Sequence, residues 1–398
     1  MEEHLKGLNN EQKEAALHVK GPILIIAGAG AGKTKTITHR IVNLIKQGIS
    51  PDKILAVTFT NKAAKEMRER IITEIEKNAK GQNSIPFVST FHSLGVFIIK
   101  ENARMLGLTK YFTILDEGDA VSIIKESLKE LNIDPKQYDP KKIKGVISRE
   151  KGKFVHLADF SEGESSVYGG IVAKVWSLYE KKKMQENSLD FDDLLLKATK
   201  LLKEKPEIRK IYQEKWEYIH IDEYQDTNEV QYLLSKMLAE DNKNICVVGD
   251  ADQNIYSWRG ANLKNILSFE KDYPNSKIVL LEENYRSTKN ILEAANVIIK
   301  KNKYRPDKNL FTNKEVGEKI GLYEALEEND EAEFVATKIL EILDQGSASS
   351  NFSALRPSLE YEGGTLGKLK IERGFAKKKK NKKQLFEGVS RLTSRELQ

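Results

Sequence analysis

Short apolar runs alternate with amphipathic patterns of helical period along the first part of the chain. Residues 23–28, 53–60 and 85–93 contain apolar runs as long as buried strands, and residues 34–48 and 61–77 between them repeat apolar side chains at helical spacing. Strands that alternate with helices in this way are typical of a parallel sheet covered by helices. The pattern therefore predicts the α/β class.

The pattern changes in the middle of the chain. Residues 111–187 read as charged amphipathic helices separated by polar loops, without a convincing buried strand, which predicts a helical insertion. Strand patterns resume at 217–223 and 243–250, and a further strand and helix follow at 277–302. Beyond about residue 345 the sequence becomes polar and rich in lysine, and it predicts no packed element.

The length and the apolar content limit the possible classes of protein. With 398 residues the chain exceeds the roughly 250–300 residues at which a single core stops growing, so we expect at least two domains. The longest apolar runs are shorter than the ~18 residues of a membrane helix, and the N-terminus lacks the pattern of a secretion signal. These features predict a cytoplasmic protein without a membrane partner. Cys246 lies in an apolar run and is expected to be a buried strand thiol rather than a nucleophile or metal ligand.

The net charge of +6 comes from the end of the chain. Residues 351–398 contain 12 Lys and Arg against 5 Asp and Glu, so residues 1–350 sum to −1. A lysine run such as 377–380 is more typical of a solvated, disordered segment than of a binding patch. An argument for nucleic-acid binding must therefore come from motifs, although the tail predicts a salt-dependent contribution that ignores base sequence.

A glycine-rich segment, AGAGAGKT, joins the first apolar run to the first helical pattern. Between a strand and a helix, such a segment directs backbone N–H groups and the positive helix end toward one concavity, which suits a polyphosphate. Lys33 would reach the β- and γ-phosphates, and the Thr34 hydroxyl would hold Mg²⁺. Ala27 replaces the first glycine of the strict pattern, and a turn that binds nothing is the alternative. The predicted nucleotide-binding residues of this segment are Ala27, Gly28, Ala29, Gly30, Ala31, Gly32, Lys33 and Thr34.

Two adjacent carboxylates follow the apolar run at 218–221. Because α/β sheets place ligands at the C-terminal ends of their strands, Asp222 would hold Mg²⁺ through water, and Glu223 would take the proton from an attacking water. Such a pair can also be two isolated surface acids. The presence of a phosphate-binding segment upstream favours a shared site.

Six segments in chain order resemble the superfamily 1 helicases of the UvrD/Rep/PcrA type: LNNEQKEAAL, TFTNKAA, STFHSLG, IDEYQD, VVGDADQNIYSWRGA and LEENYRS. The likeness runs from about Leu8 to about Leu340. It implies an α/β fold with a RecA-like P-loop NTPase sheet at 1–112 and 188–279, a helical insertion at 113–187, and the start of a second RecA-like domain at 280–345. Residues 346–398 are expected to form a basic, disordered tail.

The resemblance also assigns nucleotide contacts to individual residues. Gln12 matches the glutamine that hydrogen-bonds adenine, Tyr285 the aromatic residue that stacks on the base, and Arg286 the arginine that touches the γ-phosphate. Arg40 is similar to a further nucleotide-contacting arginine, although a surface charge is the alternative. Gln253 resembles the glutamine that senses the γ-phosphate and orients water. The implied catalytic residues are Lys33, Glu223, Gln253 and Arg286, and the implied metal ligands are Thr34 and Asp222.

The resemblance further implies a track for single-stranded DNA. Non-specific binding of single strands combines backbone contacts with aromatic side chains on which bases stack. Phe59 and Trp258 would by themselves be read as core residues, and only the family pattern places them on this track. The implied DNA-binding residues are Thr58, Phe59, Thr60, Asn61, His92, Tyr256, Trp258 and Arg259.

The implied activity is ATP hydrolysis with Mg²⁺ and 3′–5′ movement on single-stranded DNA, which separates a 3′-tailed duplex. A monomer is expected, with partners from DNA repair or replication. Two late motifs of the family have no convincing counterpart, so we expect a truncated or frame-shifted ending, apolar surface exposed by VIIKKN and FVATKILEIL, and poor solubility. A module that binds ATP and single strands without unwinding is the alternative. Another P-loop ATPase, such as a kinase or clamp loader, would not explain YSWRGA together with NYRS.

Overall fold

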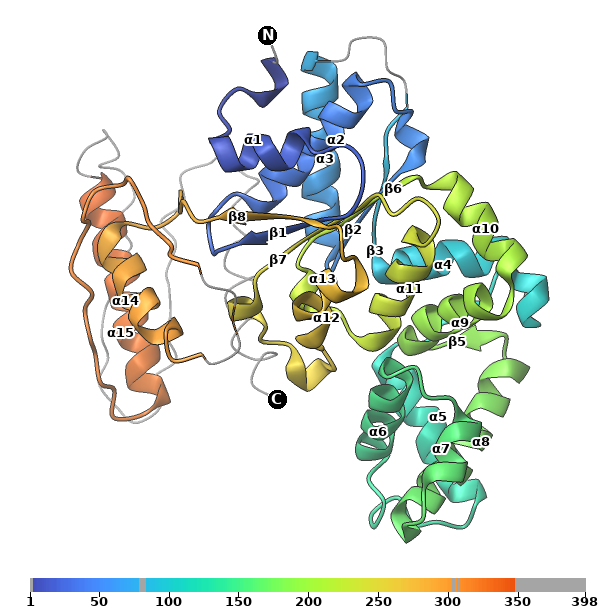
Figure 1. Cartoon of the computed structure of the whole chain (residues 1–398). Coiled ribbons are helices and arrows are strands. Elements are labelled where there is room, and N and C mark those ends of the chain that lie inside the picture. The colour runs from blue at the N-terminus through green and yellow to red at the C-terminus, as the bar shows by residue number, and fades with distance from the viewer. Residues whose placement is uncertain (1–2, 79–83, 303–304, 306–307, 348–398) are drawn as a thin grey trace, which may run out of the picture. The chain divides into compact units, whose positions relative to one another are not determined.

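The computed structural model describes residues 3–78, 84–302, 305 and 308–347 (Figure 1). These residues belong to two compact units that divide after Ile320. The first unit contains the large sheet and the helical insertion, and the second contains the helix α15 (Glu328–Ser347). The predicted tail lies outside the described residues from residue 348 onward.

A six-stranded parallel sheet forms the centre of the first unit. Its strands follow the order β3-β2-β6-β7-β1-β8, and every neighbouring pair is parallel. The strands are β1 (Ile23–Ala27), β2 (Ile54–Thr58), β3 (Phe87–Thr90), β6 (Tyr218–Ile221), β7 (Ile245–Gly249) and β8 (Lys277–Leu281). Each lies in an apolar run that predicted a strand, so the α/β class is confirmed.

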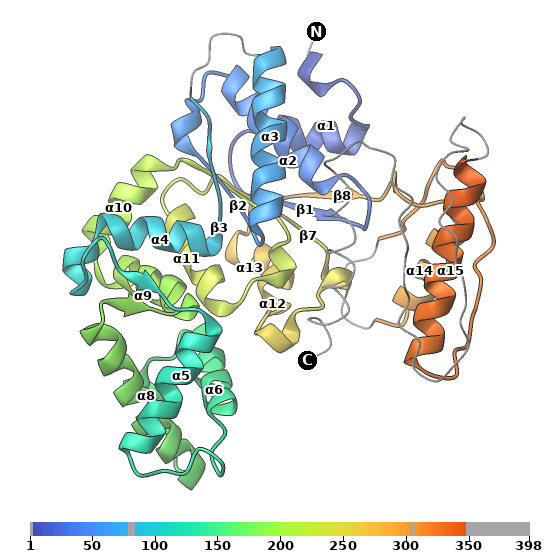
Figure 2. The same cartoon turned by 180° about the vertical axis from the view of Figure 1, so that it is seen from behind.

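Helices cover both faces of this sheet (Figures 1 and 2). Along β1, Ile23 and Ile25 pack into one core with α1 to α3, whereas Leu24 and Ile26 pack into the other core with α4, α9 and α11. A strand buried on both faces has no polar side to show, which explains the continuous apolar runs. The helices are α1 (Asn10–Leu17), α2 (Lys33–Lys46), α3 (Asn61–Asn78), α4 (Phe91–Glu101), α9 (Phe191–Glu204), α10 (Pro206–Lys215), α11 (Glu229–Ala239), α12 (Lys264–Leu267) and α13 (Phe269–Asp272).

The predicted helical insertion has its own core, centred on side chains such as Ile124, Trp176 and Tyr179. It consists of α5 (Glu117–Glu130), α6 (Pro140–Gly152), α7 (Leu157–Gly163) and α8 (Val167–Gln185). A pair of short parallel strands, β4 (Thr113–Ile114) and β5 (Ser188–Leu189), stands at its base. The sequence pattern does not predict β4, because its two exposed residues form no apolar run.

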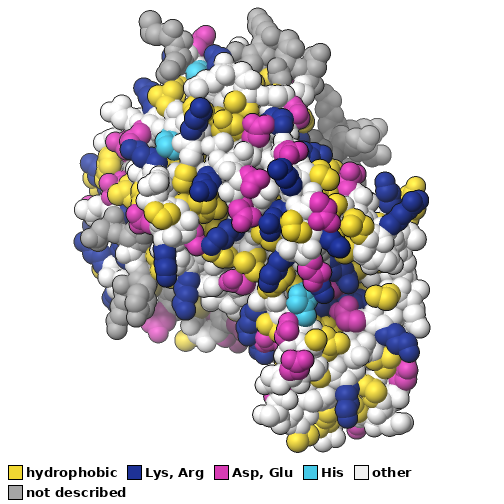
Figure 3. Space-filling view, turned by 45° about the vertical axis from the view of Figure 1, so that its right-hand side comes forward, with side chains coloured by type: hydrophobic (Ala, Val, Ile, Leu, Met, Phe, Trp, Pro, Cys, Tyr) yellow, Lys and Arg dark blue, Asp and Glu magenta, His cyan; other side chains and the backbone are white. Residues whose placement is uncertain are grey.

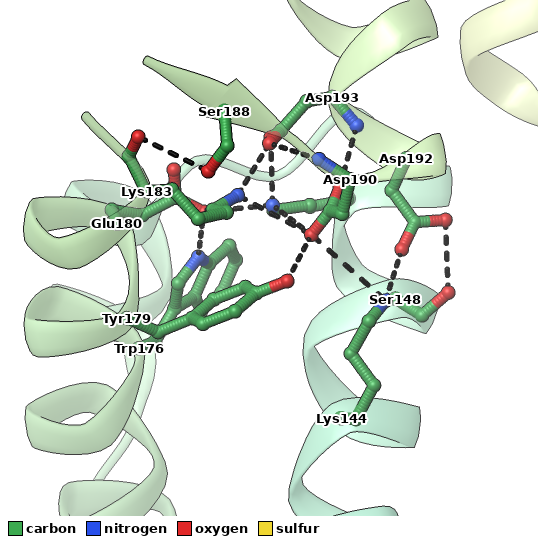
Figure 4. Close-up of polar contacts among 11 residues, drawn as sticks. Lys144, Ser148, Trp176, Tyr179, Glu180, Lys183, Ser188, Asp190, Asp192 and Asp193 are labelled. Carbon is green, nitrogen blue, oxygen red and sulfur yellow. Dashed lines mark hydrogen bonds and ion pairs between the residues drawn. The ribbon is translucent and has the colours of Figure 1, made fainter. Parts of the chain in front are cut away.

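A buried ionic network connects this insertion to the sheet-containing part (Figure 4). The Lys151 ammonium lies 2.7 Å from Asp193 Oδ1 and 3.1 Å from Asp190 Oδ2, and Lys183 forms ion pairs with the same two aspartates. All four side chains are 2% exposed. Asp190 also caps α9 by accepting the Asp193 backbone N–H at 2.8 Å, so the network fixes the start of this helix.

One face of the molecular surface carries mixed charges. On the face shown in Figure 3, basic and acidic side chains are interspersed over the described residues, as the near-zero charge of residues 1–350 predicts. Helix α14 (Lys289–Ile299) exposes Val297 and Ile298, and α15 exposes Ile342 and Leu343, in agreement with the expected apolar surface. Among the described residues, every helix is too short or too polar to span a bilayer.

Candidate functional site

The glycine-rich segment joins β1 to α2, as its sequence predicted. Gly30 and Gly32 have φ angles of +70° and +81°, a region that other residues rarely adopt. A Cβ added to Gly30 would lie 2.7 Å from the Arg286 Cβ, so this position also needs the small residue for close packing. The loop therefore has the backbone of a phosphate-binding turn at the start of a helix.

Five predicted site residues meet beside this loop. The Lys33 ammonium lies 2.5 Å from Glu223 Oε2 and donates to Gln253 Oε1 at 3.2 Å. Thr34 Oγ1 donates to Asp222 Oδ2 at 3.1 Å. Residues that are about 190 positions apart in sequence thus form one cluster at the C-terminal edge of the sheet.

The order of the strands explains why three segments, not two, build this cluster. Strand β7 lies between β1 and β6, so its end brings Asp250 and Gln253 between the P-loop and the two acids. Gln225 joins these segments, because its Nε2 donates to Glu223 Oε2 at 3.0 Å and its Oε1 accepts the Asp250 N–H at 2.9 Å. Glu223 itself has a left-handed backbone, with φ of +52°. This unusual backbone and the amide of Gln225 hold the Glu223 carboxylate toward Lys33.

The electrostatics suit a magnesium-bound triphosphate. Burial, assisted by the adjacent Glu223 charge, raises the pKa of Asp222 to about 6. Burial and Glu223 also raise the pKa of Asp226 to about 6. A cation near this group of acids would favour their charged forms. The Thr34 hydroxyl and the Asp222 carboxylate are the hard oxygen donors that Mg²⁺ prefers, and Mg²⁺ commonly binds through few protein ligands and substrate phosphates.

No group of three or more His, Cys, Asp or Glu side chains capable of holding a metal ion by itself occurs among the described residues. Thr34 and Asp222 offer oxygen donors that could hold a magnesium ion together with nucleotide phosphates. When bound, such an ion neutralises phosphate charge.

The two residues expected to contact the base lie near one another. Gln12, in α1, is buried, and its Nε2 donates to the Ala31 carbonyl oxygen of the P-loop at 2.9 Å. Its helix cap Asn9 donates to Glu283 Oε2 at 3.2 Å, and the hydroxyl of Tyr285 donates to the same oxygen at 2.5 Å. The Tyr285 side chain is 44% exposed.

The two predicted arginines differ in their surroundings. Arg286 is exposed and its backbone N–H is held by Asn284 Oδ1 at 2.9 Å, in a turn that contacts the P-loop through Asn284 Nδ2 and the Ala29 carbonyl oxygen. Arg40 is 1% exposed, and its guanidinium donates to the carbonyl oxygens of Ala15 at 3.2 Å and Val19 at 3.4 Å. The structure does not bring Arg40 to the cluster, so the predicted nucleotide contact is replaced by a structural role between α2 and the end of α1.

Some of the predicted DNA-binding residues lie at the same edge of the sheet, at the ends of β2 and β3. Phe59 is partly buried and packs edge-on against Phe91 at 5.6 Å between ring centroids, and His92 packs similarly against Phe191 at 5.7 Å. Thr60 and Asn61 are exposed at the start of α3. Thr58 is buried as the last residue of β2, so its side chain is not available to a phosphate, contrary to the expectation.

The loop after β7 carries the remaining DNA-binding candidates. Trp258 is 73% exposed in a short 3₁₀ turn, Ser257–Arg259, and Tyr256 before it is partly exposed. Gly260 ends the turn with φ of +87°. An exposed tryptophan is uncommon, and its position is consistent with a platform for stacking. The Arg259 side chain lies outside the described residues.

Several residues that shape the site were not predicted. Gln225 and Asp250 lie inside the quoted motifs IDEYQD and VVGDADQ, and Asn284 lies inside LEENYRS, so their sequence neighbourhood could have indicated them. Lys308 forms ion pairs with Asp250 and Asp252, although nothing in its own sequence context indicated the site.

Comparison with known proteins agrees with this geometry. A model of the UvrD/REP helicase N-terminal domain matches residues 8–274, and a model of the UvrD-like helicase C-terminal domain matches residues 279–361. The chain is 49% identical over 343 residues to the ATP-dependent DNA helicase PcrA of Bacillus subtilis (strain 168). The matched region covers 86% of this chain and 46% of that protein. It is 47% identical over 352 residues to the PcrA of Staphylococcus aureus (strain Mu50), covering 88% and 48% of the two chains.

The fold and the cluster define a RecA-like P-loop protein with a helical insertion. The chain belongs to the UvrD/REP family of superfamily 1 helicases and is similar to PcrA. It spans about half the length of the curated relatives it matches.

Proposed function

We propose that this chain binds magnesium-ATP at the cluster and hydrolyses it, as the motor part of a UvrD-type helicase that moves 3′ to 5′ on single-stranded DNA. The observation that carries the proposal is the convergence of Lys33, Glu223 and Gln253 beside the pair formed by Thr34 and Asp222. These are the groups that phosphoryl transfer to water requires: a cation on the phosphates, a proton acceptor, and an amide that orients water.

The ion pair between Lys33 and Glu223 suggests how hydrolysis depends on the nucleotide. The Lys33 ammonium lies 2.5 Å from Glu223 Oε2. Phosphate oxygens carry more negative charge than one carboxylate, so a bound triphosphate would draw Lys33 away. Glu223 is then free to accept a proton from a water molecule next to the γ-phosphate. Arg286, from the segment after β8, supplies a second cation for the charge that develops there.

Single-stranded DNA would bind along the C-terminal edge of the sheet. The exposed ring of Trp258 and the neighbouring Tyr256 offer stacking surfaces on the loop that begins at Gln253. A change at the γ-phosphate that moves Gln253 therefore moves the stacking loop, which would couple hydrolysis to movement on the strand.

The decisive experiment measures ATP hydrolysis with and without oligo-dT, followed by strand displacement on 3′-tailed and 5′-tailed duplexes. We expect DNA-stimulated hydrolysis and displacement only with the 3′ tail. A chain that binds neither magnesium-ATP nor oligo-dT would refute the proposal.

The alternative is a module that binds ATP and single strands without unwinding. It is favoured by the apolar side chains exposed on α14. Hydrolysis without strand displacement on either tailed duplex would select this alternative.

A further inference from the structure

A buried lysine from the segment after α14 reaches the loop that follows β7. The Lys308 side chain is 2% exposed, and its ammonium forms ion pairs with Asp250 Oδ1 and with Asp252 Oδ2, the latter at 2.9 Å. Burial and the nearby Lys33 lower the pKa of Lys308 to about 8, so the ammonium remains charged at neutral pH. None of the roles assigned above uses this cation.

The carboxylate that Lys308 contacts also fixes an amide of the candidate site. Asp250 Oδ2 accepts a hydrogen bond from Gln253 Nε2 at 2.7 Å. Because Nε2 is held there, the Gln253 Oε1 points the other way and accepts the Lys33 ammonium at 3.2 Å. A continuous chain of polar contacts therefore runs from Lys308 through Asp250 and Gln253 to Lys33.

Residues 310 and 311, which follow Lys308, contact the P-loop and the end of β8. A Cβ added to Gly28 would lie 2.1 Å from Leu310 Cδ2, so Leu310 packs directly against the P-loop glycine. One residue further, the Phe311 N–H donates to the Glu282 carbonyl oxygen at 3.1 Å. Lys308 thus enters the site from a segment anchored on both the P-loop and the end of β8.

We propose that Lys308 is a positioning residue for ATP hydrolysis, which acts through Asp250 on the Gln253 amide. This inference rests on the hydrolysis proposed above. Asp250 is 2% exposed, and without Lys308 its carboxylate would lose its cation in a poorly solvated place. It would then shift or take a proton, and either change weakens the charge-assisted bond that orients Gln253.

The first test separates turnover from ATP binding. In Lys308→Met, we expect kcat of oligo-dT-stimulated hydrolysis to fall about 10-fold to 100-fold, while KM for ATP stays within about 3-fold, since a misplaced catalytic group costs turnover on that order. Lys301→Met, which removes an exposed lysine near the same helix end, should behave like the parent chain. Lys308→Gln provides a second variant, and thermal unfolding of each variant establishes that it folds.

A double-mutant cycle with Gln253→Ala separates positioning from a general loss of structure. If Lys308 acts through Gln253, adding Lys308→Met to Gln253→Ala should change the single-turnover rate by less than about 2-fold. If the rate reductions caused by Lys308→Met and Gln253→Ala multiply in the double variant, the two residues act independently and the proposal is wrong. The proposal is also wrong if folded Lys308→Met has the same kcat as the parent. A parent chain that hydrolyses no ATP overturns the proposed function and this inference together, whereas an active parent with an unaffected variant overturns only the role of Lys308.

Discussion

At the scale of single residues, the contact between Lys33 and Glu223 predicts that substitutions here affect magnesium-ATP binding and the rate of hydrolysis differently. Glu223→Gln keeps a side chain of the same size but removes the proton acceptor. We expect magnesium-ATP binding, measured by calorimetry, to persist, and kcat to fall by about 10²-fold to 10⁴-fold. Lys33→Ala should abolish hydrolysis, because Lys33 is the basic residue of the segment AGAGAGKT and would hold the β- and γ-phosphates. A Glu223→Gln chain with parental turnover would assign the proton acceptor elsewhere.

The raised pKa of Asp222 predicts a pH dependence of magnesium-ATP binding. Its pKa of about 6 means that the carboxyl is neutral below that pH and charged above it. A proton therefore competes with Mg²⁺, and affinity should fall as pH decreases through about 6. The measurement is a set of calorimetric titrations one pH unit below and one above this value.

The control for this pH dependence is Glu223→Gln. Since the Glu223 charge is one cause of the raised pKa of Asp222, its removal should shift the midpoint to lower pH. The titration of ATP itself is the same in both proteins, so an unchanged midpoint would attribute the effect to the nucleotide.

At the scale of elements, the loop after β7 predicts a separation of DNA binding from ATP binding. Trp258→Ala removes an exposed stacking surface and should weaken oligo-dT binding by about 1–3 kcal/mol, measured by fluorescence anisotropy, with ATP affinity nearly unchanged. Tyr111→Ala removes another exposed aromatic side chain, outside the predicted track, and should have no effect. Equal DNA affinity of the Trp258 variant and the parent would show that this ring is not a stacking platform.

The buried network between the insertion and α9 predicts a large difference between adjacent lysines. Burial alone would raise the pKa of Asp190, but the ammonium groups of Lys151 and Lys183 hold it well below its usual value. Lys183→Met leaves the two buried carboxylates, Asp190 and Asp193, to share the Lys151 ammonium, so one buried negative charge is no longer balanced. It should lower the free energy of unfolding by about 3–5 kcal/mol. Lys182→Met breaks only surface pairs, with Glu126 and Glu130, and should cost about 1 kcal/mol or less. Denaturant unfolding compares the two, and similar losses would contradict this account.

The elements were more predictable from sequence than the contacts between them. The six strands follow from continuous apolar runs, and the P-loop follows from glycines between a strand and a helix. That β7 stands between β1 and β6 is a property of the strand order, which local patterns do not contain. Asp250 and Lys308 were therefore missed as partners, and Arg40 was misjudged because a charged residue in an amphipathic helix gives no sign of burial.

At the scale of the whole molecule, exposed apolar side chains bear on the state of association. The family resemblance predicts a monomer, whereas Val297 and Ile298 on α14 are 66% and 68% exposed. Adjacent exposed apolar side chains favour contact with another surface, so we expect the isolated chain to associate as its concentration rises. Sedimentation velocity over a range of concentrations distinguishes the two expectations.

A pair of variants on α14 tests whether this helix causes the association. Replacement of Val297 and Ile298 by Gln removes exposed apolar area without adding charge, and it should restore a monomer at concentrations where the parent associates. Replacement of Glu293 and Lys300, exposed polar residues on and just after the same helix, by Gln changes the same number of side chains and should leave the association as it was. If the apolar variant associates as strongly as the parent, the contact surface lies elsewhere. The apolar side chains on α15, which include Ile342 and Leu343, are then the next candidates, because they are 67% and 63% exposed.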